Sequence, residues 1–353
     1  MNLAVIGLSI TSSWGNGHAT TYRALLRDFA RRGHRVVFFE DNKPWYSAHR
    51  DQVAIPGVEI ILYSGPDDLA ANHVDTIAGA DAVIVGSYVP DGQLVGDWVL
   101  RTARGVRAFY DIDTPVTLEA VCNDECAYLR RGQIAEYDLY FSFTGGPILD
   151  RLEKEFGSPA AIALYCAVDP GSYFPTGTEP SWDLGYLGTF APDRQPGLER
   201  FLLEPSRRWA GGRFVVAGSG YPEDMEWPEG VHRISHLPPA GHRTFYGAQR
   251  FTLNLTRAAM VRAGFSPSVR LFEAAACGVP VITDRWEGLD TFFEPGREIH
   301  VAATTDDVLQ ILHDLPSAEA RSIGRRALAR VEESHTSAHR AAELESYLTP
   351  VLA

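Results

Sequence analysis

The chain has 353 residues, of which 45% are hydrophobic and 22% are charged, a balance that excludes a disordered or fibrous chain. Its length suits two α/β domains, each large enough for its own core. A net charge of −13, from 32 basic and 45 acidic side chains, argues against a protein that wraps nucleic acid, because phosphate contacts need a dense basic face.

The N-terminal sequence MNLAVIGLSI predicts a first strand rather than a signal peptide, because it lacks a basic region and its apolar run stops at Ser9. No apolar stretch approaches the roughly 20 residues that span a bilayer. We therefore expect a cytoplasmic protein without a transmembrane segment. Cys122 and Cys126 are expected to share a helix face, but the four cysteines offer too few neighbouring ligands for a metal, so we expect reduced thiols.

The first half of the chain alternates strands with helices. Apolar runs predict strands at 3–8, 34–40, 58–63, 81–87, 106–113 and 137–143. Amphipathic patterns predict helices at 20–32 and 94–104. Strands joined through a crossover helix pair in parallel, so this half predicts a parallel sheet.

A Pro-, Gly-, Ser- and Thr-rich stretch at 169–182 is the best linker in the chain. After it the alternation restarts, with strands expected within 183–189, 213–220, 232–237, 250–256 and 279–284. Helices are expected at 197–209, 267–277, 306–312, 317–334 and 336–348. The fold class is therefore α/β, with two Rossmann-like domains facing across a cleft. The predicted boundaries are 1–168, 169–334 and a C-terminal helix, 335–353, that crosses back to the first domain.

The segment Gly264 to Asp284 combines features of an anion site. Ser266 is the expected N-cap and Pro267 the first residue of a helix whose free N–H groups and dipole suit a diphosphate. Glu273 lies on this helix. The alternative interpretation is a tight packing joint between helix and strand, with Glu273 in solvent.

The string SPSVRLFEAAACGVPVITDRWEGLDTFFEPGREI resembles the donor-site motif of glycosyltransferase family 4 and its relatives of the GT-B fold. It is most similar to the CgeB-like (spore maturation protein type) branch, which DLGYLGTFAPDRQP and RFTLNLTRAAMVRAGF also resemble. The resemblance covers most of 183–300. It implies a donor nucleotide-sugar domain at the C-terminal side, an acceptor domain at the N-terminal side, a hydroxyl acceptor, retention of anomeric configuration, and no metal or other cofactor.

Carried over by residue, Glu273 matches the second Glu of the family's E-x7-E motif, which binds the ribose hydroxyls of the donor. The first Glu of the motif is replaced here by Phe265, so the family's usual sugar contact does not transfer. The diphosphate is expected to contact backbone N–H groups of the loop Gly264 to Ser266 and of the helix start after it. A basic residue is expected to neutralise the diphosphate; Arg194 is the first candidate, and Arg257 and Arg270 are the other two. For any one of these arginines taken alone, a surface ion pair is the favoured interpretation, and the position of all three near predicted strand ends is what points to the diphosphate. The full set of expected donor residues is Gly188, Thr189, Arg194, Gly218, Arg257, Gly264, Phe265, Ser266, Ser268, Arg270 and Glu273.

In the first domain, the loop SSWGNGH follows the first strand. A dinucleotide-binding fingerprint needs a set glycine spacing after the first strand and an acidic residue at the end of the second. Glu40 ends the second strand, but the glycine spacing of this loop does not fit. Acceptor contacts are expected at Trp14, Gly15, Asn16 and Gly17. The expected catalytic candidates are His18, Asp111 and Asp113; strand alternation would place the two aspartates on one side. The alternatives are a turn capped by Asp113 and a surface histidine.

The leading hypothesis is transfer of a sugar from a nucleoside diphosphate sugar to an acceptor hydroxyl, with no nucleic-acid partner. A nucleotide-sugar epimerase of the same fold is the second hypothesis. The third is a non-catalytic nucleotide-sugar-binding protein, which the replacement by Phe265 favours and the presence of Glu273 opposes.

Overall fold

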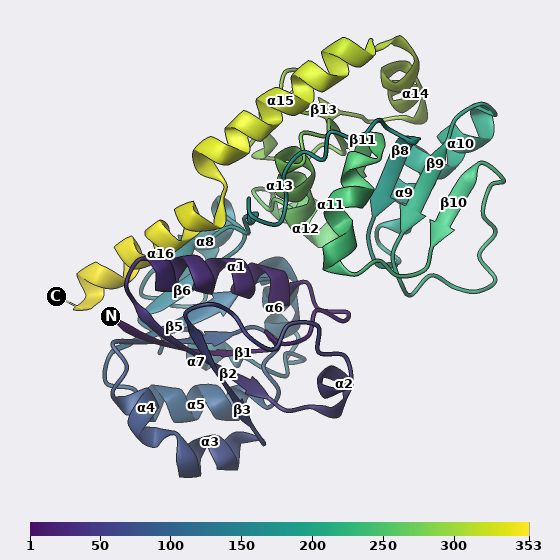
Figure 1. Cartoon of the computed structure of the whole chain (residues 1–353). Helices are drawn as coiled ribbons and strands as arrows, with labels where there is room; N and C mark the ends of the chain where they lie inside the picture. Colours follow the sequence, from purple (N-terminus) through teal and green to yellow (C-terminus); the bar gives the residue numbers. More distant parts are fainter. Residues whose placement is uncertain (353) are drawn as a thin grey trace. The chain divides into compact units, whose positions relative to one another are not determined.

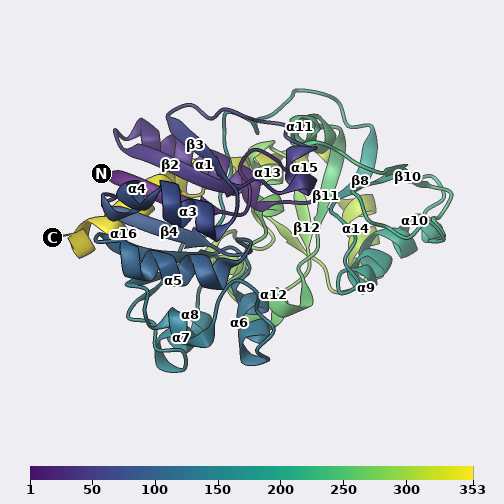
Figure 2. The same cartoon turned by 90° about the horizontal axis from the view of Figure 1, so that it is seen from below.

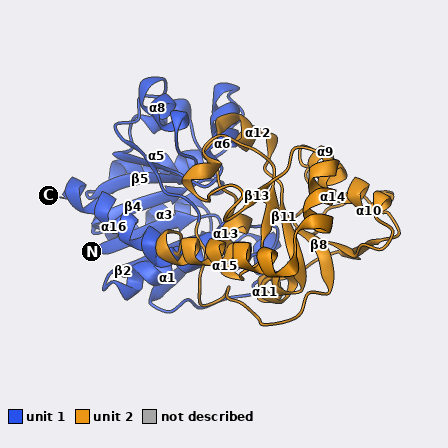
Figure 3. Cartoon of the chain, turned by 90° about the horizontal axis from the view of Figure 1, so that it is seen from above, with its two compact units in different colours: residues 1–166, 337–353 blue, residues 167–336 orange. Residues whose placement is uncertain are grey.

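The computed structural model describes residues 1–352; Ala353, the last residue of the predicted segment 335–353, lies outside the described residues. The chain divides into two compact units (Figure 3). Unit 1 comprises Met1–Cys166 and the C-terminal segment from Ser337, and unit 2 comprises Ala167–Thr336. No helix within 1–352 is long and apolar enough to cross a membrane.

Within the described residues, unit 1 is built on a seven-stranded parallel sheet of order β3-β2-β1-β4-β5-β6-β7. The strands are β1 (Asn2–Gly7), β2 (Arg35–Asp41), β3 (Val58–Tyr63), β4 (Ala82–Gly86), β5 (Val106–Asp111), β6 (Leu139–Ser142) and β7 (Ala161–Ala163). The helices are α1 (His18–Arg31), α2 (Pro44–Ser47), α3 (Pro66–Asn72), α4 (Val74–Ala78), α5 (Gly92–Thr102), α6 (Thr114–Cys122), α7 (Arg131–Ile134), α8 (Pro147–Lys154) and α16 (Ser337–Leu352). Helices α1 and α16 lie on one face of the sheet, and α3, α4 and α5 cover the other (Figures 1 and 2). Because both faces are covered, central strands such as β4 are buried along their whole length.

Unit 2 has a six-stranded parallel sheet, counted over 167–336, of order β10-β9-β8-β11-β12-β13. The strands are β8 (Trp182–Leu187), β9 (Phe214–Ala217), β10 (Val231–Ile234), β11 (Gln249–Asn254), β12 (Val281–Thr283) and β13 (His300–Val301). The helices are α9 (Gln195–Leu198), α10 (Glu204–Arg208), α11 (Pro239–Gly247), α12 (Ala258–Ala263), α13 (Val269–Ala276), α14 (Thr305–Asp314) and α15 (Ser317–Ser334). Helices α9, α10 and α14 lie on one side of the sheet, and α11, α13 and α15 on the other (Figure 3).

The last helix belongs to unit 1 and packs along α1 (Figure 1). Its first residue, Ser337, donates a hydrogen bond of 2.5 Å to the buried Asp28 of α1. Near its other end, Glu345 pairs with Arg32 and, at 3.0 Å, with His34. Ala341, Leu344 and Leu348 are buried in the unit 1 core.

The predicted α/β class with two parallel-sheet units is confirmed. One local prediction was wrong. Cys122 and Cys126 do not share a helix face, because α6 ends at Cys122 and Asp124 turns the chain with a φ of 57°. The helix predicted at 197–209 is present at 195–208, where α9 and α10 are continuous through a π-helical turn, Glu199–Leu203. All four cysteines are free thiols.

Candidate functional site

The strand order of each sheet reverses at one point, and ligands of open α/β sheets bind beyond the carboxyl ends of the strands at that point. In unit 1 the reversal falls between β1 and β4, and in unit 2 between β8 and β11. The loops that follow these four strands carry most of the residues singled out from the sequence.

Three arginines gather beyond the carboxyl ends of β8 and β11 in unit 2. Arg270, on α13, donates to the Leu187 carbonyl at the end of β8 and, at 3.1 Å, to Asn254 Oδ1 at the end of β11. Arg194 donates to the Thr189 carbonyl at 2.7 Å. Arg257, directly before α12, lies 3.6 Å from the carboxylate of Asp193. The competing predictions for a single basic residue therefore converge on one cluster, which we call the arginine triad.

Among the triad, Arg194 carries its charge in an unfavourable environment in the free protein. Burial lowers the pKa of Arg194, and the positive charges of Arg270 and Arg257 lower it further. Arg194 Nε is buried without a hydrogen-bond partner among the described residues. Like charges held together with too few carboxylates are a common arrangement for an anion site, because the ligand supplies the missing negative charge.

The glycines of this region allow the loops after β8 and β9 to pack closely against each other. The N–H of Gly188 donates to the Ala217 carbonyl at 2.9 Å, which joins the loops after β8 and β9. Gly218 has a φ of 149°, and a Cβ there would collide with the carbonyl of Gly188. The close approach that Gly218 permits is therefore to Gly188 of the neighbouring loop. Thr189 follows on this loop and is exposed.

The start of α13 differs from the prediction. The N-cap is Ser268, whose hydroxyl accepts from the Arg270 N–H at 3.3 Å, and the helix begins at Val269. Ser266 is not the cap, because its hydroxyl donates to the Gly264 carbonyl at 3.0 Å and Pro267 precedes the helix. The predicted anion-binding helix start is thus two residues further along the chain, next to Arg270 of the triad.

Phe265 has a strained backbone, with a φ of 46° that bulky side chains rarely adopt. Its N–H donates to the Glu287 carbonyl at 2.6 Å. Its ring covers Gly288, where a Cβ would strike it. Gly264, with a φ of 68°, lies against Glu287 as well. The loop before α13 is therefore fixed to the loop after β12, and it presents the exposed carboxylate of Glu287 beside it.

Glu273 is 5% exposed, on the face of α13 that packs against α11. Its Oε2 accepts from the hydroxyl of Tyr246 at 3.1 Å. Burial and the nearby Glu273 charge raise the pKa of Tyr246 and of Tyr173, so both hydroxyls stay protonated as donors. The interpretation of Glu273 as a solvent-exposed residue is wrong, and its carboxylate is held in one place.

In unit 1 the loop after β1 is fixed from within. Asn16 is 5% exposed; its amide donates to the carbonyls of Ser9 and Ser12, and its oxygen accepts from the His18 N–H at 3.0 Å. Glu40 accepts from the backbone N–H groups of Ile10 and Thr11 at 2.7 and 2.9 Å. Asn16 and Glu40 thus hold the loop. Its exposed part consists of Trp14, which stacks on His49, with Gly15 and Gly17.

A second cluster joins the loops after β1, β4 and β5. The hydroxyl of Tyr88 donates to Asp113 Oδ2 at 2.7 Å, and the His18 ring packs edge-on against the Tyr88 ring, with centroids 5.4 Å apart. Tyr88 has a φ of 62°, a second strained position. Burial lowers the pKa of His18 to about 4, so the imidazole is neutral at pH 7. His18 Nδ1 has no hydrogen-bond partner within 1–352.

Asp111 and Asp113 do not lie on one side of a strand, because β5 ends at Asp111 and Asp113 stands directly before α6. Asp111 is fully buried and accepts from Tyr140 at 2.6 Å, Thr117 at 2.8 Å and the Asp113 N–H at 3.1 Å. Burial raises the pKa of Asp111 to about 6. Both of its oxygens are occupied, which suits a residue that positions the loop. Asp113 stands at the N-cap position of α6, as in the alternative interpretation, but its side chain makes no cap hydrogen bond to the helix.

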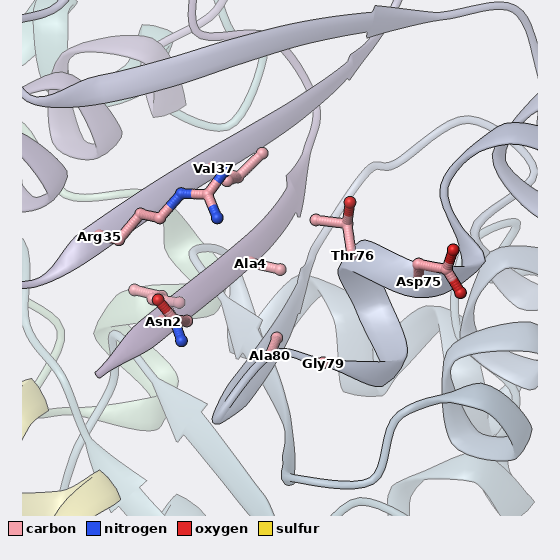
Figure 4. Close-up of a pocket in the computed structure, with 9 residues that line it drawn as sticks. Asn2, Ala4, Arg35, Val37, Asp75, Thr76, Gly79 and Ala80 are labelled. Atoms are coloured by element: carbon pink, nitrogen blue, oxygen red, sulfur yellow. The ribbon is translucent and has the colours of Figure 1, made fainter.

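A small cavity of about 250 Å³ lies elsewhere in unit 1, at the amino ends of β1 and β2 (Figure 4). Arg35 reaches over it from β2, and Asp75 and Thr76 face it from α4. Arg35 pairs with Glu59 at 3.0 Å, so its charge is already compensated. The cavity is at the opposite end of the strands from the His18 cluster and is smaller than most small-molecule sites.

Comparison with known proteins adds to this geometry. A family model described as glycosyl transferase-like matches residues 194–346, which contain the arginine triad and Glu273. No curated protein matches the sequence.

Solved structures resemble the whole chain at low sequence identity. Sucrose-phosphate synthase from Thermosynechococcus elongatus is 15% identical, with a TM-score of 0.73 over 99% of both chains. The chain has the GT-B fold. Anabaena HepE, in complex with UDP-glucose, is 13% identical with a TM-score of 0.69 over 99% of this chain and 100% of that one. An alpha-glucosyltransferase in complex with UDP-glucose and DNA is 11% identical, with a TM-score of 0.73 over 99% of both chains.

Sequence reasoning missed three residues of these clusters. Tyr88 binds Asp113, Tyr246 binds Glu273, and Asp193 pairs with Arg257. Tyr88 follows Ser87 at the end of a predicted strand, a position that marks ligand loops in this class of fold. Tyr246 lies on α11, which no sequence pattern predicted, so nothing marked it.

Proposed function

We propose that the chain is a glycosyltransferase that moves a sugar from a nucleoside diphosphate sugar to an acceptor hydroxyl without a metal ion or other cofactor. The arginine triad carries the proposal. Its three guanidinium groups meet at the switch point of the unit 2 sheet, and Arg194 is partly buried among like charges. Guanidinium groups suit the oxygens of a diphosphate and stabilise the charge that develops when it leaves, a role that a metal fills in other enzymes.

Unit 2 would hold the donor through three kinds of contact. The triad and the N-terminus of α13 face the diphosphate. Glu273 accepts from the ribose hydroxyls, with Tyr246 fixing its position. Glu287, whose carboxylate lies beside Phe265, would contact the sugar. The likeness to solved structures that hold UDP or UDP-glucose makes UDP-glucose the first donor to test. The sequence segments that resemble the donor-site motif favour the CgeB-like branch.

Unit 1 would bind the acceptor through the exposed loop residues Trp14, Gly15 and Gly17. The acceptor oxygen forms a bond to the anomeric carbon, the bond from that carbon to the diphosphate oxygen breaks, and the acceptor proton must leave. In an inverting reaction, neutral His18 or Asp113 accepts that proton. In a retaining reaction, which the resemblance implies, no separate protein base is required. The anomeric configuration of the product decides between these routes.

The test is release of UDP from UDP-glucose in the presence of a panel of hydroxyl acceptors. Glu273→Gln should lower kcat/KM at least tenfold, and Arg207→Gln, an exposed arginine paired with Glu199 and Glu204, should not change it. Conversion of the sugar without acceptor would support the epimerase instead. If UDP, GDP and dTDP all fail to raise the melting temperature, the chain does not bind a donor and the proposal is wrong.

A further inference from the structure

A groove of about 760 Å³ lies in unit 2, at the other end of its sheet from the arginine triad. Its walls include Asp183 near the start of β8, Gln249 and Arg250 at the start of β11, and Pro280 directly before β12. The triad follows the carboxyl ends of the same strands. The groove is therefore separate from the proposed donor site, and its volume is in the range of small-molecule pockets.

The groove is basic, although the chain as a whole carries a net charge of −13. Four arginines line it, against the carboxylates of Glu179 and Asp183; these arginines are Arg213, Arg250, Arg321 and Arg325. Arg213 lies 3.5 Å from Asp183. Arg250 donates to the carbonyls of Leu312 and Leu315 at the end of α14, at 2.7 and 2.6 Å.

The other two arginines have no such partners. Arg321 and Arg325 are exposed, and neither has a hydrogen bond or ion pair within residues 1–352. They are four residues apart on α15, so they share a helix face, where like charges repel. The groove therefore contains two adjacent guanidinium groups whose charge no described side chain neutralises.

The remaining walls favour a hydroxylated anion. Pro316 and Ser317 line the groove, and they are the start of α15, an 18-residue helix whose first N–H groups and dipole favour negative charge. Thr176 and Thr178 add hydroxyl groups from the segment before β8. A single phosphate would leave most of 760 Å³ unfilled, so the ligand has a body as well as a charge.

We propose that this groove binds a phosphorylated small molecule with several hydroxyl groups, of the chemical class of sugar phosphates. Arg321 and Arg325 contact its phosphate, and the threonine side of the groove contacts its hydroxyls. The site does not depend on the proposed transferase activity, because its lining includes neither an arginine of the triad nor Glu273 or Tyr246.

Calorimetric titration tests the site. The full chain is first saturated with UDP, so that any phosphate binding at the donor site is blocked, and is then titrated with glucose 6-phosphate or with inorganic pyrophosphate. We expect saturable binding of glucose 6-phosphate that weakens with salt. The double variant Arg321→Gln, Arg325→Gln should bind roughly a hundredfold more weakly, since each charge-assisted contact accounts for about tenfold.

The control is the double variant Arg326→Gln, Arg330→Gln, which makes the same charge change on the same helix outside the groove and should bind like the wild type. Thermal melts confirm that both variants fold. The proposal is wrong if glucose 6-phosphate gives no saturable binding to the wild type, whether or not pyrophosphate binds. It is also wrong if the groove variant binds as tightly as the wild type, or if both double variants weaken binding equally, which would indicate only bulk charge.

Discussion

Replacing Arg194 should separate folding from ligand binding. Arg194 is partly buried near Arg257 and Arg270, and burial and these charges lower its pKa. Its Nη2 donates to the exposed Thr189 carbonyl, which water can satisfy in a variant. Arg194→Met keeps much of the apolar stem and removes the charge. We therefore expect the free variant to melt no lower than the wild type.

The same variant should lose affinity for UDP. A charge-assisted hydrogen bond contributes about 1.5–3 kcal/mol, which corresponds to a Kd increase of roughly 10- to 100-fold. At a UDP concentration of about 100 times the wild-type Kd, binding stabilises the wild type by about 2.7 kcal/mol and the variant by about 0.4–1.4 kcal/mol. For a unit of this size, the melting temperature should rise by about 5–10 °C in the wild type and by about 1–5 °C in the variant.

Scanning fluorimetry with and without UDP measures both effects, and calorimetric titration gives Kd. Arg207→Met, on the exposed surface of the same unit, is the matched control and should keep the full UDP shift. If Arg194→Met melts lower than the wild type yet keeps the whole UDP-dependent shift, Arg194 is a structural residue and not a ligand of the diphosphate.

The remaining predictions concern unit 1 and the backbone. Burial lowers the pKa of His18 from 6.5 in the unfolded chain to about 4 in the folded protein. Between these pH values the unfolded chain binds a proton that the folded protein does not, so stability falls as the pH drops from 6.5 to 4. His18→Asn should flatten this part of a plot of melting temperature against pH. In an inverting reaction with Asp113 as the base, Tyr88→Phe removes the hydrogen bond that positions this base. The variant should then lower kcat at least tenfold in steady-state assays, while the Kd for UDP in calorimetry stays unchanged. Gly218→Ala brings a Cβ into the Gly188 carbonyl and should lower the free energy of unfolding by about 2 kcal/mol or more in urea titrations, whereas an equal stability would contradict the observed backbone.

The elements predicted well from the sequence are those with strong local signals. The strand at 58–63 has the predicted bounds, and most other central strands differ by one or two residues at an end, because continuous apolar runs between turn residues define a buried parallel strand. The strand predicted at 232–237 ends three residues earlier, at Ile234, and the short edge strands β7 and β13 were not predicted. The missed helices, such as α3 and α11, are short, and their form depends on packing against a sheet that a local pattern does not describe. Pro239–Gly247 in particular has no long apolar stripe.

The sequence predicts where the site residues lie in the fold better than it predicts which residues they contact. Arg194, Arg257 and Arg270 follow predicted strands, and parallel strands bring their carboxyl ends together, so their convergence follows from topology. The placement of the cap at Ser268 was not predictable, because Ser266 and Ser268 are equally good caps by composition. The partner of Asp113 was missed for another reason: Tyr88 reaches it through a left-handed backbone that the sequence does not signal.

The most direct test of the central claim is an experimental structure of the full chain with UDP. We expect the diphosphate between Arg194, Arg257 and Arg270, within about 3.2 Å of at least two of their guanidinium groups, with the ribose at Glu273. A diphosphate bound elsewhere, or triad arginines that keep their present partners with no nucleotide at saturating UDP, would contradict the assignment of unit 2 as the donor-binding unit.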